Sequence, residues 1–354
     1  MAIWGKNMNP ANLVIVDGIP VGEGQPCYFI AEIAGNFADE AQAVRIVDAA
    51  VRAGADAVKF QTFKANTITT RNNRFDMPSV GSRLQYDVFR EAQTPMELQR
   101  FIVRYCKERG ITVFSAPSHM SDLESMVELD MPAWKIGSDL ATHIPLLREV
   151  ARTGKPIFLS TGMCTMDEVA LSVDAILDEG NANLLLFHCV SNYPGVAEEQ
   201  NLRAMATLRE RFGAPVGFSD HVAGIAVSLA AVALGADLIE RHFWCEGCHA
   251  GADRNISSDE HEFSQLTQGA KDIRLALGSG LKEPTTSERK NMVTNRVSII
   301  LMQDADSGTV LTPEMIDIRR PGSGLPPHEW SQVIGRRLNQ RLSAETPLKM
   351  EYLA

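Results

Sequence analysis

The chain has 354 residues, a formal net charge of −10 at pH 7, 45% hydrophobic residues and 22% charged residues. This is the composition of an ordinary soluble protein, long enough for about two domains. The acidic balance argues against a nucleic-acid partner, and no cluster of Lys and Arg interleaved with aromatic residues opposes that conclusion.

Membrane insertion and disulfide stabilisation are not indicated either. No apolar run reaches the roughly 18 residues that a membrane span requires. The amino terminus also lacks the basic and then apolar layout of a signal peptide. We therefore expect a cytoplasmic protein without a membrane partner, and reduced thiols at its six scattered cysteines.

From Cys27 onward, short apolar strands alternate with amphipathic helices. The expected strands are 27–33, 57–62, 112–117, 133–137, 156–162, 183–189, 216–220 and 238–243. The expected helices include 39–53, 95–109, 122–129, 144–152, 166–178, 202–211, 224–234 and 262–277. Eight such units within about 250 residues favour a (β/α)8 TIM barrel over a doubly wound sheet, and place the active site at the strands' carboxyl ends.

The segments outside these units suggest how the chain is divided. Residues 1–26 are expected to form an edge strand or a hairpin that closes the barrel floor, and residues 66–90 to form a long loop. The repeating pattern ends at a linker with Gly and Pro, after which short strands and turns follow. We expect a barrel domain over 1–280, a linker over 281–294 and a small β-rich domain over 295–354.

Polar side chains gather at the carboxyl ends of the expected strands. Before the last strand they include Glu32, Lys59, Gln61, Lys135, Ser138, Ser160, Ser191, Tyr193, Ser219 and His221. A single lysine would more often be a solvated surface charge, but Lys59 and Lys135 both end apolar strands. Two lysines with several hydroxyl groups predict a site for an anion such as phosphate.

The last two strands each deliver a histidine to the same edge. His221 and His242 end neighbouring strands about 4.8 Å apart, so their imidazoles can point into one pocket and share a metal ion. Ser219 and Glu240 face the same way, two residues earlier on each strand. One histidine alone is more often satisfied by hydrogen bonds, whereas this pair with polar companions favours a metal site.

Six motifs, taken in order, resemble the N-acetylneuraminate (sialic acid) synthase family. They are Ile30-Ala-Glu-Ile-Ala-Gly-Asn36, Val58-Lys-Phe-Gln-Thr62, Lys135-Ile-Gly-Ser138, Leu159-Ser-Thr-Gly-Met163, Gly217-Phe-Ser-Asp-His221 and Glu240-Arg-His-Phe243. The resemblance covers nearly the whole chain and extends to Gly251-Ala-Asp253. It implies a metal-dependent transferase that condenses phosphoenolpyruvate with an acylamino sugar, giving a 3-deoxy-nonulosonic acid and phosphate.

The resemblance also implies roles for individual residues. It implies that His221 and His242 hold a divalent metal, typically Mn²⁺ with Mg²⁺ or Co²⁺ as alternatives, and that Glu32 and Asp253 contact the sugar. It implies phosphoenolpyruvate contacts at Lys59, Lys135, Ser138, Ser160, Ser219 and near Ser191 and Tyr193.

Three positions depart from the family's pattern. Relatives commonly read Asn-His-Asn-Gly where this chain has Asn36 and Phe37, and Ser-x-Glu where it has Leu140. They read Asp-His where it has Arg254 after the aspartate. These departures bear on the acceptor sugar more than on the chemistry, and Asp139 stands one position before the missing carboxylate.

The carboxyl-terminal residues resemble the antifreeze-like (SAF) domain that follows the barrel in this family. The resemblance rests on Asn295-Arg-Val-Ser-Ile, the turn at Gly308, residues 311–316 and Arg319-Arg-Pro-Gly322. In such enzymes the arginine of Arg-Pro-Gly reaches into the barrel of a partner subunit, and here it is Arg320. The resemblance therefore implies a domain-swapped homodimer.

Other readings of the same residues stay open. A Schiff-base aldolase would use Lys135 or Lys59 covalently, and a catalytically silent protein would sense a sugar acid or phosphoenolpyruvate. Cys245-Glu-Gly-Cys248-His249 matches the pattern of c-type haem attachment. It follows the last strand directly and no export signal accompanies it, so we expect an ordinary loop over the mouth of the active site.

Overall fold

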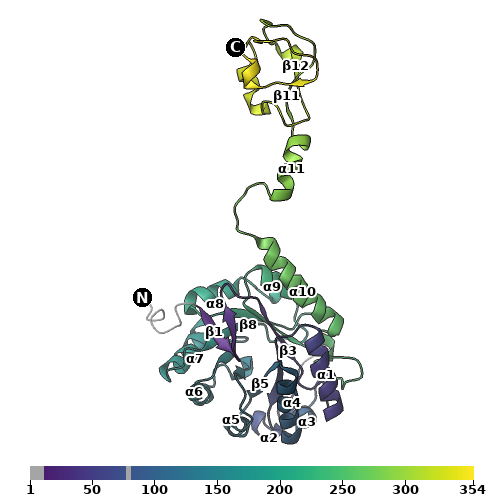
Figure 1. The fold of residues 1–354 in the computed structure, drawn as a ribbon. Helices are drawn as coiled ribbons and strands as arrows, with labels where there is room; N and C mark the ends of the chain where they lie inside the picture. Colours follow the sequence, from purple (N-terminus) through teal and green to yellow (C-terminus); the bar gives the residue numbers. More distant parts are fainter. Residues whose placement is uncertain (1–11, 77–80) are drawn as a thin grey trace. The chain divides into compact units, whose positions relative to one another are not determined.

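The structure, a computed structural model, describes residues 12–76 and 81–354. The chain divides into two compact units, Met1–Gly278 and Ser279–Ala354 (Figure 1). Each unit has a buried apolar cluster of its own. The expectation for residues 1–11 and for positions 77–80 of the long loop lies outside the described residues.

The first unit is a closed barrel of eight parallel strands in the order β10-β3-β4-β5-β6-β7-β8-β9. The strands are β3 (Tyr28–Glu32), β4 (Ala57–Thr62), β5 (Thr112–Pro117), β6 (Trp134–Ile136), β7 (Ile157–Ser160), β8 (Leu184–Cys189), β9 (Val216–Asp220) and β10 (Leu238–His242). Strands that follow one another in sequence are neighbours, and the last pairs with the first, His242 opposite Glu32. The predicted TIM barrel is confirmed.

Helices follow the strands and surround the barrel (Figure 1). The main ones are α1 (Glu40–Arg52), α4 (Met96–Arg109), α5 (Met120–Val127), α6 (Ile144–Arg152), α7 (Met166–Asp178), α8 (Ala204–Phe212), α9 (Ala226–Ala233) and α10 (Glu260–Leu277). Their ends follow from local chemistry. Asp39 caps α1 by accepting from the Gln42 backbone N–H, and Gly110 ends α4 with a φ of 68° that favours glycine.

The segment between β4 and α4 is more ordered than the predicted loop over 66–90. It contains two short helices, α2 (Ala65–Ile68) and α3 (Gln85–Ala92). The ring of Phe89 lies 5.4 Å from that of Phe63 and 5.5 Å from that of Phe75. These aromatic contacts give α3 a small core of its own, so the prediction of a plain loop was wrong for that part of the segment.

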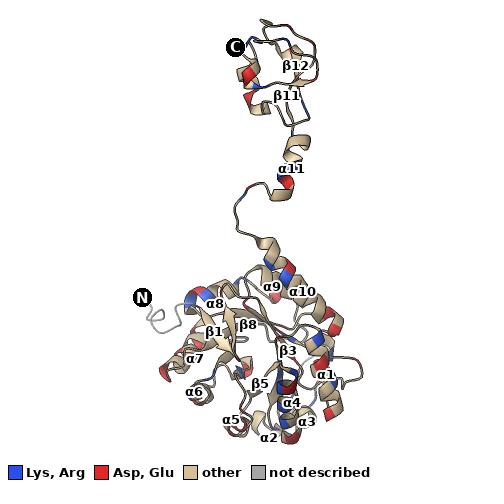
Figure 2. Cartoon of the chain, viewed as in Figure 1, with Lys and Arg blue, Asp and Glu red and all other residues tan. Residues whose placement is uncertain are grey.

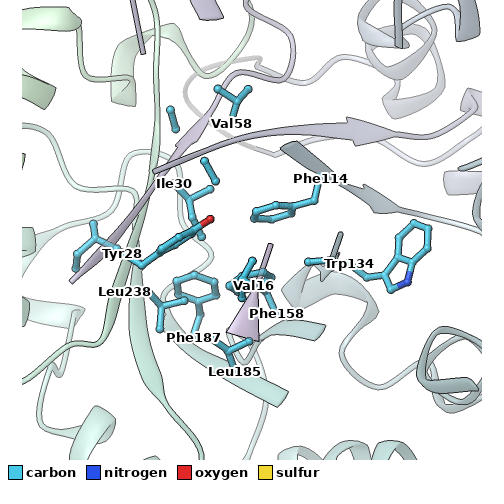
Figure 3. Packing of buried hydrophobic residues seen from close by; sticks show 14 of the residues in the cluster. Val16, Tyr28, Ile30, Val58, Phe114, Trp134, Phe158, Leu185, Phe187 and Leu238 are labelled. Carbon is cyan, nitrogen blue, oxygen red and sulfur yellow. The ribbon is translucent and has the colours of Figure 1, made fainter. Parts of the chain in front are cut away.

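The barrel floor is closed by a hairpin of β1 (Leu13–Val16) and β2 (Ile19–Gly22), one of the two predicted forms. Val16 is fully buried, and Figure 3 shows it among the side chains of the barrel core, near Phe158 and Phe187. The apolar interior thus fills the amino-terminal end of the barrel and leaves the opposite end to polar residues.

The first helix of the second unit is α11 (Thr286–Asn295), and the unit contains an antiparallel sheet in the order β12-β11-β13. The strands are β11 (Ser298–Leu301), β12 (Ile316–Arg319) and β13 (Thr346–Pro347), and a short helix α12 (Trp330–Val333) packs with them. Figure 2 shows Lys and Arg interspersed with Asp and Glu on the barrel helices, without a wide basic face in that view. Among the described residues, none of the helices has the length and apolar character needed to cross a membrane.

Candidate active site

The pleat of two neighbouring strands positions the central polar residues. Alternate residues of a barrel strand face the interior, so Glu240 and His242 on β10 point the same way. The parallel register places Glu240 opposite Ser219 of β9 and His242 opposite Glu32 of β3. All four side chains are buried at the carboxyl end of the barrel.

Two buried lysines share one buried carboxylate there. The Nζ atom of Lys59 forms an ion pair with Glu32 and lies 3.2 Å from Oε2 of Glu240. The Nζ atom of Lys135 lies 3.6 Å from Oε1 of Glu240 and donates to Oγ of Ser160 at 2.6 Å. Each charged side chain is at most 6% exposed, so neither lysine is a solvated surface charge.

Burial and neighbouring charges shift the pKa values of this cluster. Burial lowers the pKa of Lys59 to about 8, although Glu240 opposes the shift. Burial alone would raise the pKa of Glu240, but Lys135 and Lys59 outweigh it and hold that pKa at about 2. The Ser219 hydroxyl donates to Oε1 of Glu240 at 3.0 Å. Glu240 is therefore a fixed anion that orients both ammonium groups toward one region.

His221 and His242 face each other beside the lysines. Their ring centroids are 5.5 Å apart, and the ring of Tyr193 lies 4.2 Å from that of His221. Nδ1 of His221 lies 3.0 Å from the carbonyl oxygen of Val190. Because a carbonyl only accepts, Nδ1 carries a proton, and Nε2 has a lone pair when the ring is neutral, which is the tautomer of many metal-binding histidines.

The two imidazoles fit a divalent metal ion. Nδ1 of His242 is buried and lacks a hydrogen-bond partner in the described part of the chain, and it lies 3.8 Å from Oδ2 of Asp253. Burial lowers the pKa of His242 well below its usual range, so its ring is neutral and able to bind a cation. The described residues contain no group of three or more His, Cys, Asp or Glu side chains placed to hold a metal. His221 and His242 would therefore be its protein ligands, with water or substrate completing the shell.

A glycine leaves room for two hydroxyl groups at the end of β7. The backbone N–H of Gly162 donates to Oγ of Ser138 at 3.0 Å. A Cβ atom at Gly162 would lie 2.8 Å from Oγ of Ser138 and even closer to Oγ of Ser191. Only glycine keeps both hydroxyls clear of steric overlap at this position, where they can donate to an anion.

Asp220 and Arg241, which the sequence did not single out as functional, join the same strand ends from the outer face. Nη1 of Arg241 lies 2.6 Å from Oδ2 of Asp220, Nη2 donates to the Val222 carbonyl at 2.9 Å, and Nε donates to Oγ of Ser258 at 2.6 Å. Both charged groups are almost fully buried. The sequence did contain a signal for this ion pair: Asp220 and Arg241 have opposite charges, lie in apolar strands, and each directly precedes a histidine.

The loop after β10 brings Asp253 to the histidines. Nδ2 of Asn36 donates to the Phe243 carbonyl at 2.9 Å, and the Gly251 backbone N–H donates to Oδ1 of Asn36 at 3.3 Å. Asn36 is fully buried and thus ties this loop to the end of β3. Its structural role could not be seen in the sequence, because its partners lie more than 200 positions away.

The departures from the family's pattern have defined environments. Phe37 is buried, and Leu140 packs against the barrel core. The guanidinium carbon of Arg254 lies 3.7 Å from the centre of the Trp244 ring, which is a cation–π contact. Asp139 is exposed as a residue, although burial of its carboxyl group raises the pKa of that group.

Two predicted site residues lie apart from these contacts. Gln61 is half-buried on β4, two residues after Lys59 and therefore on the same face of the strand. Arg320 belongs to the second unit, where it follows β12 and is exposed. Its predicted contact with the barrel of a partner subunit stays a prediction.

Known proteins resemble the chain over both units. Residues 46–282 match the NeuB family and residues 296–354 match the SAF domain. The chain is 35% identical to N,N'-diacetyllegionaminic acid synthase of Legionella pneumophila over 350 residues, 96% of this chain and 98% of that protein. It is 31% identical to pseudaminic acid synthase of Campylobacter jejuni over 327 residues, 91% of this chain and 95% of that protein.

A solved structure agrees with these matches. The N-acetylneuraminic acid (sialic acid) synthetase of Leptospira borgpetersenii, crystallised in complex with citrate, superposes with a TM-score of 0.70 at 28% identity. The superposition covers 79% of this chain and 95% of that chain. The family match spans more than half of the sequence, and the relatives are matched along nearly their whole length. The chain therefore belongs to the NeuB family of acid synthases and carries a SAF domain after its barrel.

Proposed function

We propose that this protein condenses phosphoenolpyruvate with an N-acylamino sugar, giving a 3-deoxy-nonulosonic acid and inorganic phosphate. The observation that carries the proposal is the pair of buried lysines, Lys59 and Lys135, beside the facing histidines His221 and His242. The names of the similar proteins support it, since these are synthases of legionaminic, pseudaminic and sialic acids.

The lysines would bind the anionic groups of phosphoenolpyruvate. Both ammonium groups are held near Glu240 before the substrate arrives, so little reorganisation is needed when the phosphate and carboxylate bind. The hydroxyls of Ser138 and Ser191 beside Gly162 supply further donors. This arrangement favours noncovalent binding of a multiply charged anion in a site sheltered from water.

The reaction would proceed in two bond-forming steps. C3 of phosphoenolpyruvate attacks the aldehyde carbon of the open-chain sugar, and the aldehyde oxygen takes up a proton. Water then adds to C2 and loses a proton, and the bond from C2 to the phosphate oxygen breaks to leave a 2-keto acid and phosphate. A divalent metal held by His221 and His242, Mn²⁺ or a near relative, would supply Lewis acidity toward the aldehyde oxygen.

Carboxylates next to the histidines would bind the sugar. Glu32 lies opposite His242 in the strand register, and Asp253 lies 3.8 Å from it. Both can accept hydrogen bonds from sugar hydroxyls. The environments of Phe37 and Arg254 bear on which acylamino sugar is accepted.

A partner subunit would complete the site. Arg320 lies in the SAF unit, and its planar guanidinium offers a fork of donors to an acyl carbonyl or a sugar hydroxyl. We propose that it does so across a domain-swapped homodimer, as the family resemblance implies.

Phosphate release is the direct test. Metal-supplemented protein incubated with phosphoenolpyruvate and a panel of acylamino hexoses should release phosphate with at least one of them. The Lys135→Ala variant should lose most of this activity. Tight binding of phosphoenolpyruvate without phosphate release, across the whole panel, would instead favour a sensor.

A Schiff-base aldolase is a second candidate because the lowered pKa of Lys59, about 8, increases the fraction of neutral amine. Its ion pairs with Glu32 and Glu240 favour the charged form and argue against it. Borohydride reduction in the presence of pyruvate separates the two mechanisms. A reduced adduct on Lys59 or Lys135 would contradict the noncovalent role.

A further inference from the structure

Cys245 and Cys248 face each other across a tight turn in the loop after β10. The Cys248 N–H donates to the Cys245 carbonyl at 3.2 Å, and Gly247 has a φ of 80°, as the third residue of a type II turn requires. The two Sγ atoms are 2.9 Å apart. This separation is shorter than ordinary van der Waals contact, because even non-bonded carbon atoms, which are smaller than sulfur, lie about 3.5–4.0 Å apart. It is longer than a disulfide bond, which measures about 2.05 Å.

We propose that Cys245 and Cys248 form a reversible disulfide in this protein. A tight turn brings the Cα atoms of its first and last residues within about 7 Å, and disulfides bridge Cα separations of roughly 4.4–6.8 Å. The turn therefore already holds the backbone close to the geometry of a bridge. Both thiols are free in the structure, so this is the reduced form of the pair.

A metal site explains the pair less well. Structural zinc requires four ligands in most proteins, with at least two more side chains beside a Cys pair. In the described part of the chain, no three His, Cys, Asp or Glu side chains gather in a way that could hold a metal. Two sulfur atoms in close contact without further ligands are the arrangement of a dithiol.

The exposure of the two thiols assigns their order of reaction. Cys245 is 5% exposed and packs in the barrel core, whereas Cys248 is half-buried at its edge. An external disulfide, such as oxidised glutathione, therefore meets Cys248 first. The Cys248 thiolate attacks one sulfur of that disulfide and releases one thiol. The Cys245 thiolate then attacks the Cys248 sulfur and releases the second, so two protons leave the protein and the small disulfide gains two electrons.

The environment also favours the bridged form. Burial raises the pKa of Cys248 and raises that of Cys245 to about 12, although Arg45 opposes both shifts. A dithiol becomes a strong oxidant when its reduced form is stabilised as a thiolate. Here burial disfavours the thiolates, so the reduced form lacks that stabilisation and the disulfide is a weak oxidant, which a strong reductant such as dithiothreitol can still open.

The turn lies where oxidation can affect the loop that carries Asp253. The His249 N–H donates to Oε1 of Gln42 at 2.7 Å, and the Cys248 thiol donates to the Gln42 carbonyl at 3.6 Å. A disulfide removes the thiol hydrogen and with it the second contact to helix α1. We expect oxidation to change the KM of the acceptor sugar and to leave the KM of phosphoenolpyruvate nearly constant. This expectation rests on the proposed function, in which Asp253 binds the sugar.

Thiol mapping of the full chain tests the disulfide without reference to activity. Native protein is treated with oxidised glutathione or with dithiothreitol, its free thiols are alkylated under denaturing conditions, and peptides are analysed by mass spectrometry. After oxidation, two of the six cysteines should escape alkylation. The peptide that contains Cys245 and Cys248 should then be lighter by two hydrogen atoms than the same peptide with two free thiols. Dithiothreitol should restore both thiols. Alkylation of both residues, or a lasting glutathione adduct on Cys248, would overturn the proposal.

Matched variants test whether the disulfide involves Cys245 and Cys248 rather than other cysteines. Cys164→Ser removes another half-buried thiol of the barrel unit and should leave the disulfide intact. Cys248→Ser changes the more accessible partner and should abolish it, so the test does not depend on replacing the buried Cys245. With an active acceptor in hand, oxidation should change the acceptor KM several-fold in wild type and not in Cys248→Ser. An unchanged KM in oxidised wild type would refute the link to the sugar site, and absence of activity with every acceptor would count only against the proposed function.

Discussion

Arg241 and Asp220 form a buried ion pair of 2.6 Å in which each partner directly precedes one of the two facing histidines. They are opposite each other in the register of β9 and β10. Because side chains alternate between the two faces of a strand, the pair closes the outer face while His221 and His242 meet on the inner one. The spacing of the histidines thus depends on an ion pair that lies on the other side of the sheet.

Breaking this pair should destabilise the protein strongly. Arg241→Ala removes the counter-charge of the buried Asp220 carboxylate, which keeps only its hydrogen bonds from Val222 and Ser228, so we expect a loss of about 3–5 kcal/mol in the free energy of unfolding. Urea unfolding followed by circular dichroism measures it. The control is Arg148→Ala, whose ion pairs lie on the surface and should contribute far less. Equal effects of the two replacements would contradict the assigned role.

The pH dependence of catalysis should reveal Lys59. Its pKa is lowered to about 8 by burial, so its positive charge is complete at lower pH and is lost as the pH rises through that value. The kcat/KM for phosphoenolpyruvate should therefore be constant on the acid side of pH 8, apart from other groups, and fall by about tenfold per unit well above it. Lys59→Arg, if active, should move this fall to higher pH. An unchanged profile in that variant would assign the fall to another group.

Metal binding should depend on the two facing histidines. Metal-stripped protein should bind Mn²⁺ in a calorimetric titration, and His221→Ala or His242→Ala should lose this binding because each removes one of the two protein ligands. His249→Ala, in the exposed part of the loop, is the matched control and should keep it. Chelation with EDTA should abolish turnover and added metal should restore it. Undiminished turnover in metal-stripped protein would refute a metal-dependent reaction.

The glycine at the end of β7 should be intolerant of a side chain. Gly162→Ala places a Cβ atom against the hydroxyls of Ser138 and Ser191, so these groups must move away from a bound anion. A hydrogen bond to a charged group contributes about 1.5–3 kcal/mol, which corresponds to a loss of roughly 10–100-fold in affinity for phosphoenolpyruvate. Ser191→Ala removes one hydroxyl directly and should show a loss of similar size. Full affinity for phosphoenolpyruvate in both variants would show that the hydroxyls beside Gly162 do not belong to the substrate site.

Subunit mixing tests the position of Arg320. If its guanidinium serves the partner's barrel, inactive Arg320→Ala protein mixed with inactive His221→Ala protein should regain activity. A hybrid dimer then contains one barrel with intact histidines and an arginine donated by the other chain. Subunit exchange must be shown first by mass spectrometry of labelled chains. Failure to complement after proven exchange would place Arg320 in its own subunit's site or outside catalysis.

The barrel could be predicted closely because each of its strands is specified by residues that are close together in the sequence. A buried parallel strand is a short apolar run, and polar residues such as Lys59 and Lys135 stand out at its end. Strand β4 has the predicted bounds, and β10 differs by one residue. The order of the strands followed from the alternation with helices alone.

Contacts between distant segments could not be predicted in the same way. Asn36 looked like part of a loop motif, but its partners Phe243 and Gly251 are brought to it only by barrel closure. Asp220 and Arg241 are charged residues that could equally have been at the surface, so the sequence did not predict their buried ion pair. The approach of Cys245 to Cys248 depends on the conformation of the turn between them. Their spacing in the sequence did not predict it, because the same spacing occurs in unrelated motifs such as c-type haem attachment.

Pairing of the last strand with the first has a consequence for synthesis on the ribosome. Glu32 emerges early, yet its register partner His242 belongs to β10, so the two sides of the site cannot meet until the chain beyond that strand has been made. Until then β3 and β9 are open edges with unpaired backbone groups, which can pair with other nascent chains. Chains that terminate before residue 238 should therefore aggregate, and metal affinity should appear abruptly in a series of lengthening chains.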